Sequence, residues 1–354
     1  EYAMFAALAR GGPTILNLGN HEPEFHDMAG TVARVRATGV IVIGGNTLDR
    51  ATGKPHASAS TRLNLGPREA VVVGLTTDDL ATYRVQVRPT LNLADPVEWA
   101  RQHLPSLWED TPLPILLSHA GLRADRQILP LLPDGALFAG AHDHLRLVHR
   151  TGRTVYFHSG SWTEFLSIAR LRPTPAGLRW DVEQVQLGSG DPADNALAAL
   201  IRETLATHLT PEEAFVVGRS TKALAPGEAA LFAVEAARLA AKADVALIGA
   251  TTFGAGLPAG AVTRFALEAC VRFDGTLWVA EVEGGQLGQI LRRANQGPDT
   301  PFAARAGENL VAAGSADVLP GSMYRLVTTD WIARNARKYL GDDPPAFSER
   351  PELR

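Results

Sequence analysis

Histidine side chains concentrate in three short segments that lie far apart along the chain. These segments are LGNHEPE (18–24), LLSHAG (116–121) and FAGAHDH (138–144). A neutral imidazole is a good ligand for Mn, Fe, Ni and Zn, and an asparagine carbonyl is a harder ligand suited to the same ions. The three segments therefore predict a divalent metal site, provided that the fold brings them together.

The spacing within these segments favours both metal binding and proton transfer. His142 and His144 are two residues apart, so on an extended segment both rings would point to the same side. His21 and Glu24 are three residues apart, and Pro23 suits the first turn of a helix, which would bring the two side chains together. A carboxylate in that place stabilises a protonated imidazole, the form that a general acid requires.

Each segment follows a short apolar run that is typical of a buried strand. Such runs occupy residues 14–18, 40–43, 70–73, 115–117 and 136–139. Because they are rich in Val, Ile and Leu without alternation, they predict strands covered on both faces, and hence an α/β sheet with parallel character. We expect helices within 28–37, 91–104 and 123–132, and closing strands at 154–158 and 178–187. In open α/β sheets ligands bind at the carboxyl ends of the strands, where the histidines stand here.

A break rich in glycine at residues 188–192 separates the two halves of the chain. After it, helices are expected at 193–209, 227–243 and 285–295, and buried strands at 245–248 and 277–282. The chain has 354 residues, more than one typical domain of ~100–200 residues. We therefore predict two domains, at residues 1–190 and 191–354.

Composition excludes several classes of protein. Hydrophobic residues make up 45% and charged residues 20% of the chain, as in an ordinary soluble globular protein. A net charge of −4 gives no basic surface and argues against a nucleic-acid partner. No apolar run approaches the ~20 residues of a membrane-spanning helix. Because Cys270 is the one cysteine, a disulfide framework and a thiolate metal site are excluded.

The three histidine segments, and their order along the chain, resemble the conserved sequence motifs (boxes) of the calcineurin-like metallophosphoesterases. The resemblance is to the bacterial 5′-nucleotidase branch, which carries its own C-terminal domain. GNHE (19–22) and SHAG (118–121) match two boxes, and GAHDH (140–144) is one residue longer than the family's GHxH or GHxQ box. The segment VIVIGGNTLDRATGKP (40–55) is also similar to the family. The resemblance implies an α/β protein, a metallophosphoesterase-type β-sandwich flanked by helices and followed by a smaller α/β C-terminal domain.

The resemblance also implies two divalent metal ions, with manganese or zinc expected and iron or nickel as alternatives. Asn20, His119 and His142 would bind one ion, and His144 would bind the other. His21 would bind a phosphate oxygen or protonate the leaving alkoxide, with Glu24 as its partner. Two such ions lower the pKa of an attacking water and neutralise charge on the phosphoryl oxygens.

The family's Asp-x-His and Gly-Asp boxes, which precede GNHE and supply most ligands of the first metal, have no counterpart upstream of Gly19. We expect the sequence to be a shortened version of a longer protein, and a degenerate relative is the alternative. Because relatives are usually exported, a periplasmic or extracellular location is expected.

Residues 212–340 resemble the family's C-terminal domain, which clamps a nucleoside. Phe273 and Tyr339 would stack on the base, and core packing is the competing interpretation for both. The family's turn asparagine and arginine are replaced by Gly249 and Gly254. The implied partner is a small phosphorylated substrate, with a nucleotide as one candidate.

Three further polar residues near the boxes receive their own interpretations. We expect Glu22 to hydrogen-bond its own loop and Asp143 to be a solvated loop residue. For His158, a role behind the site and simple core packing are equally supported.

The sequence thus predicts a metal-dependent hydrolase of phosphoric esters. The alternatives are a sulfate or thiosulfonate ester hydrolase of the same family and a catalytically inactive relative that binds ligands in a cleft between its domains.

Overall fold

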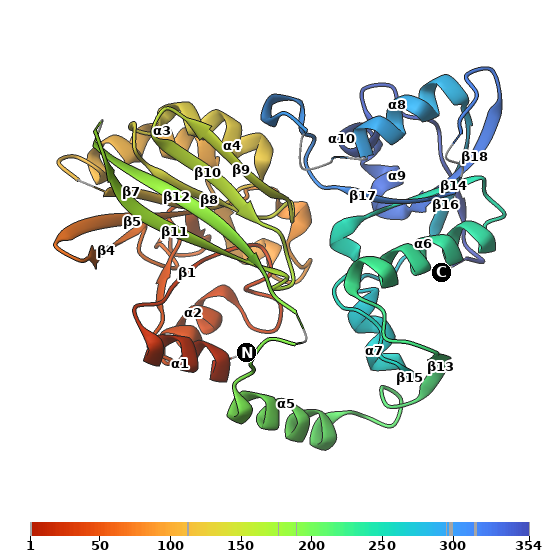
Figure 1. The fold of residues 1–354 in the computed structure, drawn as a ribbon, viewed down its shortest axis with the longest axis horizontal. Coiled ribbons are helices and arrows are strands. Elements are labelled where there is room, and N and C mark those ends of the chain that lie inside the picture. The colour runs from red at the N-terminus through yellow and green to blue at the C-terminus, as the bar shows by residue number, and fades with distance from the viewer. Residues whose placement is uncertain are drawn as a thin grey trace. The chain divides into compact units, whose positions relative to one another are not determined.

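A computed structural model describes residues 2–111, 113–175, 177–188, 190–294, 296, 300–314 and 317–353. The chain divides into two compact units, Glu1–Leu197 and Ala198–Arg354. Both combine sheets with helices, so the predicted α/β class is confirmed. Figure 1 shows the order of the elements along each unit.

A six-stranded sheet forms the centre of the first unit. Its strands, in spatial order, are β4 (Ser60–Leu65), β5 (Arg68–Thr76), β7 (Leu113–His119), β8 (Leu137–Gly140), β10 (Thr154–Ser159) and β9 (Arg146–Thr151). The four central strands are parallel, and the two edge strands are antiparallel to their neighbours. The parallel character predicted from the apolar runs is therefore confirmed, and the strands end together at one edge.

Three smaller two-stranded sheets complete the strands of this unit. They are the parallel pair β1 (Ile15–Asn17) and β2 (Ile41–Ile43), the antiparallel pair β3 (Thr47–Asp49) and β6 (Leu91–Leu93), and the hairpin β11 (Phe165–Thr174) and β12 (Gly177–Gln186). In Figure 1 the hairpin lies on one face of the large sheet. Side chains from both layers form one core between them, among them Ile115, Val155 and Trp180.

The helices of the first unit are α1 (Tyr2–Gly11), α2 (Met28–Arg36), α3 (Pro96–Leu107) and α4 (Leu122–Ile128). Two of them, α2 and α3, begin at an aspartate that caps them. The Asp95 carboxylate accepts hydrogen bonds from the first backbone N–H groups of α3, and Pro96 occupies the first helical position. Helices α3 and α4 lie on the face of the large sheet opposite the hairpin (Figure 1).

The second unit is built on a mixed five-stranded sheet. Its spatial order is β17 (Leu310–Gly314), β14 (Val245–Gly249), β18 (Met323–Thr329), β16 (Leu277–Glu283) and β19 (Ser348–Arg350). A separate pair is formed by β13 (Val216–Ser220) and β15 (Gly260–Thr263). The helices are α5 (Asn195–His208), α6 (Pro226–Ala240), α7 (Arg264–Cys270), α8 (Gly284–Ala294), α9 (Asp330–Arg334) and α10 (Ala336–Leu340).

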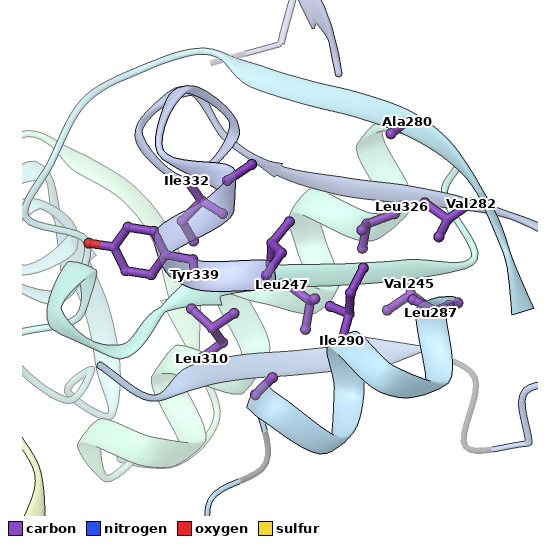
Figure 2. Packing of buried hydrophobic residues seen from close by; sticks show 13 residues of the cluster. Val245, Leu247, Ala280, Val282, Leu287, Ile290, Leu310, Leu326, Ile332 and Tyr339 are labelled. Carbon is purple, nitrogen blue, oxygen red and sulfur yellow. The ribbon is translucent and has the colours of Figure 1, made fainter. Parts of the chain in front are cut away.

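Two hydrophobic clusters pack on the two faces of this sheet. One contains Ala230 and Val234 of α6, and the other contains Leu287 and Ile290 of α8. Figure 2 shows the second cluster, in which strand residues such as Leu247 and Leu326 meet the helices. Burial of these apolar side chains is the main force that holds helices against a sheet.

Candidate active site

Three predicted ligand residues come together at the carboxyl edge of the first unit. Asn20 follows β1, His119 ends β7 and His142 follows β8. The amide oxygen Oδ1 of Asn20 lies 2.8 Å from Nε2 of His119, although the two residues are 99 positions apart. The rings of His119 and His142 make an edge-to-face contact, with centroids 5.2 Å apart. Sequence-distant loops therefore build one polar centre.

The orientation of the Asn20 amide is set by the loop that follows β5. Asn20 is buried, and its Nδ2 group donates a hydrogen bond to the carbonyl of Thr82 at 2.9 Å. Because the amide nitrogen of Asn20 donates its hydrogen bond to the Thr82 carbonyl, the amide oxygen is the atom that faces His119. The network thus presents Asn20 as an oxygen donor toward the polar centre.

Gly19 allows the close approach between this loop and His119. A Cβ atom at position 19 would lie 2.9 Å from Cγ of His119 and 3.0 Å from Oε2 of Glu22. The carboxylate of Glu22 accepts a hydrogen bond from the Gly19 N–H at 2.6 Å. The predicted role of Glu22 in holding its own loop is therefore confirmed.

Replacing Gly19 by alanine is expected to displace the His119 ring and to destabilise the first unit by about 1–3 kcal/mol, the usual cost of overpacking. Urea unfolding followed by circular dichroism would measure the loss. Gly12→Ala is a matched control, because a Cβ there meets nothing within 4 Å. Equal stability of the two variants would contradict the predicted steric conflict.

Burial holds the pKa of His119 well below its ordinary value, and the neighbouring His142, His21 and His144 lower it further. The imidazole is therefore neutral at neutral pH. Only this form has a lone pair for a metal ion.

The loop that carries His142 and His144 is not extended as predicted. Both residues adopt left-handed backbone conformations, with φ of 79° and 53°. The argument from alternating side chains is therefore wrong, because β8 ends at Gly140 and the chain turns immediately. Asp143 is not simply solvated either, since its Oδ2 accepts the N–H of Leu122 at the start of α4, at 2.6 Å.

Residues in unfavourable left-handed backbone conformations lie next to His144. The ring of His144 contacts Trp162, with centroids 5.5 Å apart, and Trp162 and Thr163 have φ of 57° and 56°. Left-handed residues other than glycine cost free energy and tend to cluster at functional sites. Trp162 belongs to the segment SGSWTEF (159–165), which resembles the segment that closes the site in the family, but its contact with His144 was not predicted.

His21 and Glu24 lie side by side as predicted, but a turn and not a helix joins them. Nδ1 of His21 is 3.4 Å from Oε2 of Glu24, and the N–H of Glu24 donates to the His21 carbonyl at 3.1 Å. The His21 side chain is 46% exposed, so it is accessible to a substrate. The pair has the geometry of an imidazole oriented by a carboxylate.

Asn20, His119 and His142 suit a divalent ion in donor type, and the spacing of Asn20 and His119 is compatible with a shared ion. Two ligand atoms at about 2.1 Å from one ion and near a right angle stand about 3 Å apart, and Oδ1 of Asn20 and Nε2 of His119 are 2.8 Å apart. Within the described ranges, no three His, Cys, Asp or Glu side chains lie close enough to hold an ion by themselves.

His158 does not line the polar centre but belongs to a buried cluster behind it. The Tyr156 hydroxyl donates to Oδ2 of Asp125 at 2.8 Å and also bonds Nε2 of His158. Asp125 was not predicted from the sequence, although a signal was present. Asp125 lies three residues after Leu122 and three before Ile128, so it falls on the buried stripe of α4.

The two aromatic residues predicted to stack on a base differ in exposure. Phe273 is 47% exposed, and the guanidinium carbon of Arg272 lies 5.4 Å from the centre of its ring. Tyr339 is 9% exposed and packs in the core cluster shown in Figure 2, and its hydroxyl accepts a hydrogen bond from Nε1 of Trp331. Core packing is thus the better interpretation of Tyr339, because the side chain is buried within this cluster.

Comparisons with known proteins agree with this architecture. Residues 206–340 match the family model of the 5′-nucleotidase C-terminal domain. The chain is similar to a 5′-nucleotidase precursor from Thermus thermophilus, with a TM-score of 0.56 and 16% identity over 98% of this chain and 81% of that one. No protein with a curated description matches the chain in sequence.

Two further solved structures share the fold. A putative 5′-nucleotidase from Staphylococcus aureus has a TM-score of 0.53 and 17% identity, over 98% of this chain and 79% of that one. The sulfate thiohydrolase SoxB from Thermus thermophilus has a TM-score of 0.57 and 18% identity, over 92% of this chain and 66% of that one.

The fold is therefore that of a two-domain α/β protein of the 5′-nucleotidase type. Its second unit contains a match to the 5′-nucleotidase C-terminal domain, over residues 206–340.

Proposed function

We propose that the protein is a metal-dependent hydrolase of phosphoric esters of the 5′-nucleotidase type. The observation that supports this most is the convergence of Asn20, His119 and His142 at the carboxyl edge of the sheet, with Oδ1 of Asn20 2.8 Å from Nε2 of His119. The 5′-nucleotidase C-terminal domain that follows in the same chain supports the same class of enzyme.

In this proposal Asn20, His119 and His142 hold one divalent ion and His144 contributes to a second. Manganese or zinc is expected, with iron or nickel as alternatives, because imidazole and amide oxygen suit these ions. Such ions lower the pKa of an attacking water and neutralise charge on the phosphoryl oxygens. The burial of His119 supports its role, since a neutral imidazole binds without first losing a proton.

His21 supplies the proton chemistry of the proposed reaction. Because its Nδ1 faces Glu24, Nε2 is the ring atom that would protonate the leaving alkoxide or bind a phosphate oxygen. The Glu24 carboxylate stabilises the charged imidazole that either role requires. The 3.4 Å separation is suited to a pair that tightens when a substrate binds, as catalytic hydrogen bonds often do.

The substrate is proposed to be a small phosphorylated molecule, with a nucleotide as one candidate. Phe273 offers an exposed ring, and stacking of a base on one aromatic ring contributes about 1–3 kcal/mol. Because Tyr339 is buried, a sandwich of the base between these two residues is not part of the proposal.

A second candidate function is the hydrolysis of sulfate or thiosulfonate esters. It is favoured by the likeness to the sulfate thiohydrolase SoxB, which is as high in TM-score as the likeness to 5′-nucleotidases. A periplasmic or extracellular location is proposed from the nucleotidase resemblance and from the likeness to a 5′-nucleotidase precursor of Thermus thermophilus. None of the helices in the described part of the chain is long and apolar enough to span a membrane.

Metal content and ester hydrolysis test the proposal together. The purified protein is expected to contain divalent metal by mass spectrometry and to hydrolyse p-nitrophenyl phosphate, and chelation followed by Mn²⁺ should abolish and then restore turnover. Turnover of thiosulfonate but not phosphate esters would favour the second candidate. Absence of both metal and turnover would contradict either function and support the inactive ligand-binding alternative.

A further inference from the structure

Directly behind the candidate site, a buried polar cluster connects helix α4 to two strands of the sheet. Its members are Ser118, Asp125, Tyr156 and His158, which we call the Asp125 cluster. Their exposed fractions are 2%, 0%, 0% and 1%. Burying a carboxylate so completely is costly unless its oxygens are hydrogen-bonded, so the contacts of Asp125 require an explanation.

Each oxygen of the Asp125 carboxylate accepts a hydrogen bond from a different strand. The Ser118 hydroxyl of β7 donates to Oδ1 at 2.6 Å, and the Tyr156 hydroxyl of β10 donates to Oδ2 at 2.8 Å. Because the tyrosine has one proton, Nε2 of His158 is the donor in its bond to the Tyr156 oxygen. One side chain of α4 thus bridges two strands that are not neighbours in the sheet.

The strand between them, β8, leaves room for this bridge. Ser118 pairs with Gly140, and Gly140 pairs with His158, so the three residues lie in one row across the sheet. A Cβ atom at Gly140 would lie 2.6 Å from Oδ2 of Asp125 and still closer to Nε2 of His158. The hydrogen bonds of Asp125 therefore cross β8 at Gly140, where any side chain would collide with Asp125 and His158.

Two residues of this row, Ser118 and Gly140, come shortly before proposed metal ligands in the sequence. His119 follows Ser118 directly, and His142 lies two residues after Gly140. The Ser118 hydroxyl also accepts the N–H of Ala120 at 3.1 Å, so the cluster holds the backbone on both sides of His119. Any change in the spacing of β7 and β8 at this row is transmitted to the two imidazoles through one or two rigid peptide units.

We propose that the Asp125 cluster positions His119 and His142 and thereby sets the affinity of the site for its metal ion. The inference depends on the proposed function, because it concerns the same ligands. Its members touch neither metal nor substrate, so they are positioning residues. Loss of such a supporting partner typically weakens metal binding by about 10–100-fold.

The test uses Tyr156→Phe and Ser118→Ala, which remove single hydroxyl groups from the cluster. Thr154→Val is the matched control, since Thr154 is buried on the same strand and its hydroxyl bonds Pro133 and Gly135 at the opposite end. Calorimetric titration with Mn²⁺ should show affinity about 10–100-fold weaker in both cluster variants. The control should bind within about twofold of the wild type, although the melting temperature of the metal-free protein falls in all three variants.

Unchanged Mn²⁺ affinity in Tyr156→Phe and Ser118→Ala would overturn the proposal, whatever their stability. Ser118→Ala, the smaller change, decides the matter if Tyr156→Phe does not fold. A wild-type chain that binds no Mn²⁺ would instead contradict the proposed function. In that case NMR of labelled histidine rings in the metal-free protein tests positioning by itself. Shifted signals of His119 and His142 in the cluster variants but not in Thr154→Val would support it, and unshifted signals would refute it.

Discussion

Replacing His119 by alanine is expected to remove one metal ion per chain from the proposed site. The affinity should fall by more than the ~10–100-fold that follows loss of a supporting residue, because a direct ligand is deleted. Asn20 and His142 would be left without the imidazole that stands between them. Mass spectrometry of the metal content and calorimetry with Mn²⁺ would measure the change.

Two further variants show whether a loss of metal in His119→Ala is specific to the proposed ligands. His103→Ala is the control, since His103 is an exposed residue of α3 in the same unit. His142→Ala should reproduce the loss of the ion, because it removes a proposed ligand of the same ion from a different loop. Wild-type metal content in His119→Ala would refute the assigned donor set.

Replacing His21 by alanine is expected to lower kcat about 10²–10⁴-fold on alkyl phosphates, the usual contribution of a general acid. The loss should be much smaller on p-nitrophenyl phosphate, because p-nitrophenolate leaves without needing a proton. Steady-state kinetics on the two substrates would measure this difference. Glu24→Gln should show the same pattern with smaller losses, since it keeps the imidazole but removes the charge beside it.

The leaving-group comparison also separates the two roles left open for His21. If His21 binds a phosphate oxygen, both substrates should lose activity equally. His26→Ala serves as the control, because this residue lies on the same loop and is assigned no role in the site. A variant of His21 with full activity on alkyl phosphates would exclude both roles.

Local sequence patterns predicted most elements of the first unit. The apolar runs at 40–43, 115–117 and 136–139 correspond to β2, β7 and β8, and the helix expected within 91–104 corresponds to α3, which begins at Pro96. These elements depend on hydrophobic burial and capping by nearby residues, which a short window of sequence contains. Short edge strands such as β4 and β9 were missed, because their pairing partners and not their own composition define them.

The sequence predicted which residues gather at the site better than it predicted how their side chains and backbone are arranged. The contact between His21 and Glu24 was expected, but from a helix that is in fact a turn. The histidines at 142 and 144 were expected on an extended segment, and their left-handed conformations arise because the chain must turn after Gly140. The burial of Tyr339 could not be predicted from its local sequence, because the core cluster in which it packs includes side chains of α8 and β17, which are distant along the chain.

The sequence by itself determined which residue types are available for the chemistry and that they follow buried parallel strands. Residue types and strand patterns are local properties of the chain, so they can be read without coordinates. Tertiary structure alone decided that Asn20 meets His119 across 99 residues, and that Asp125 lies behind them under Gly140. Such contacts depend on strand order and register, which are fixed by the packing of the whole sheet and not by any one segment.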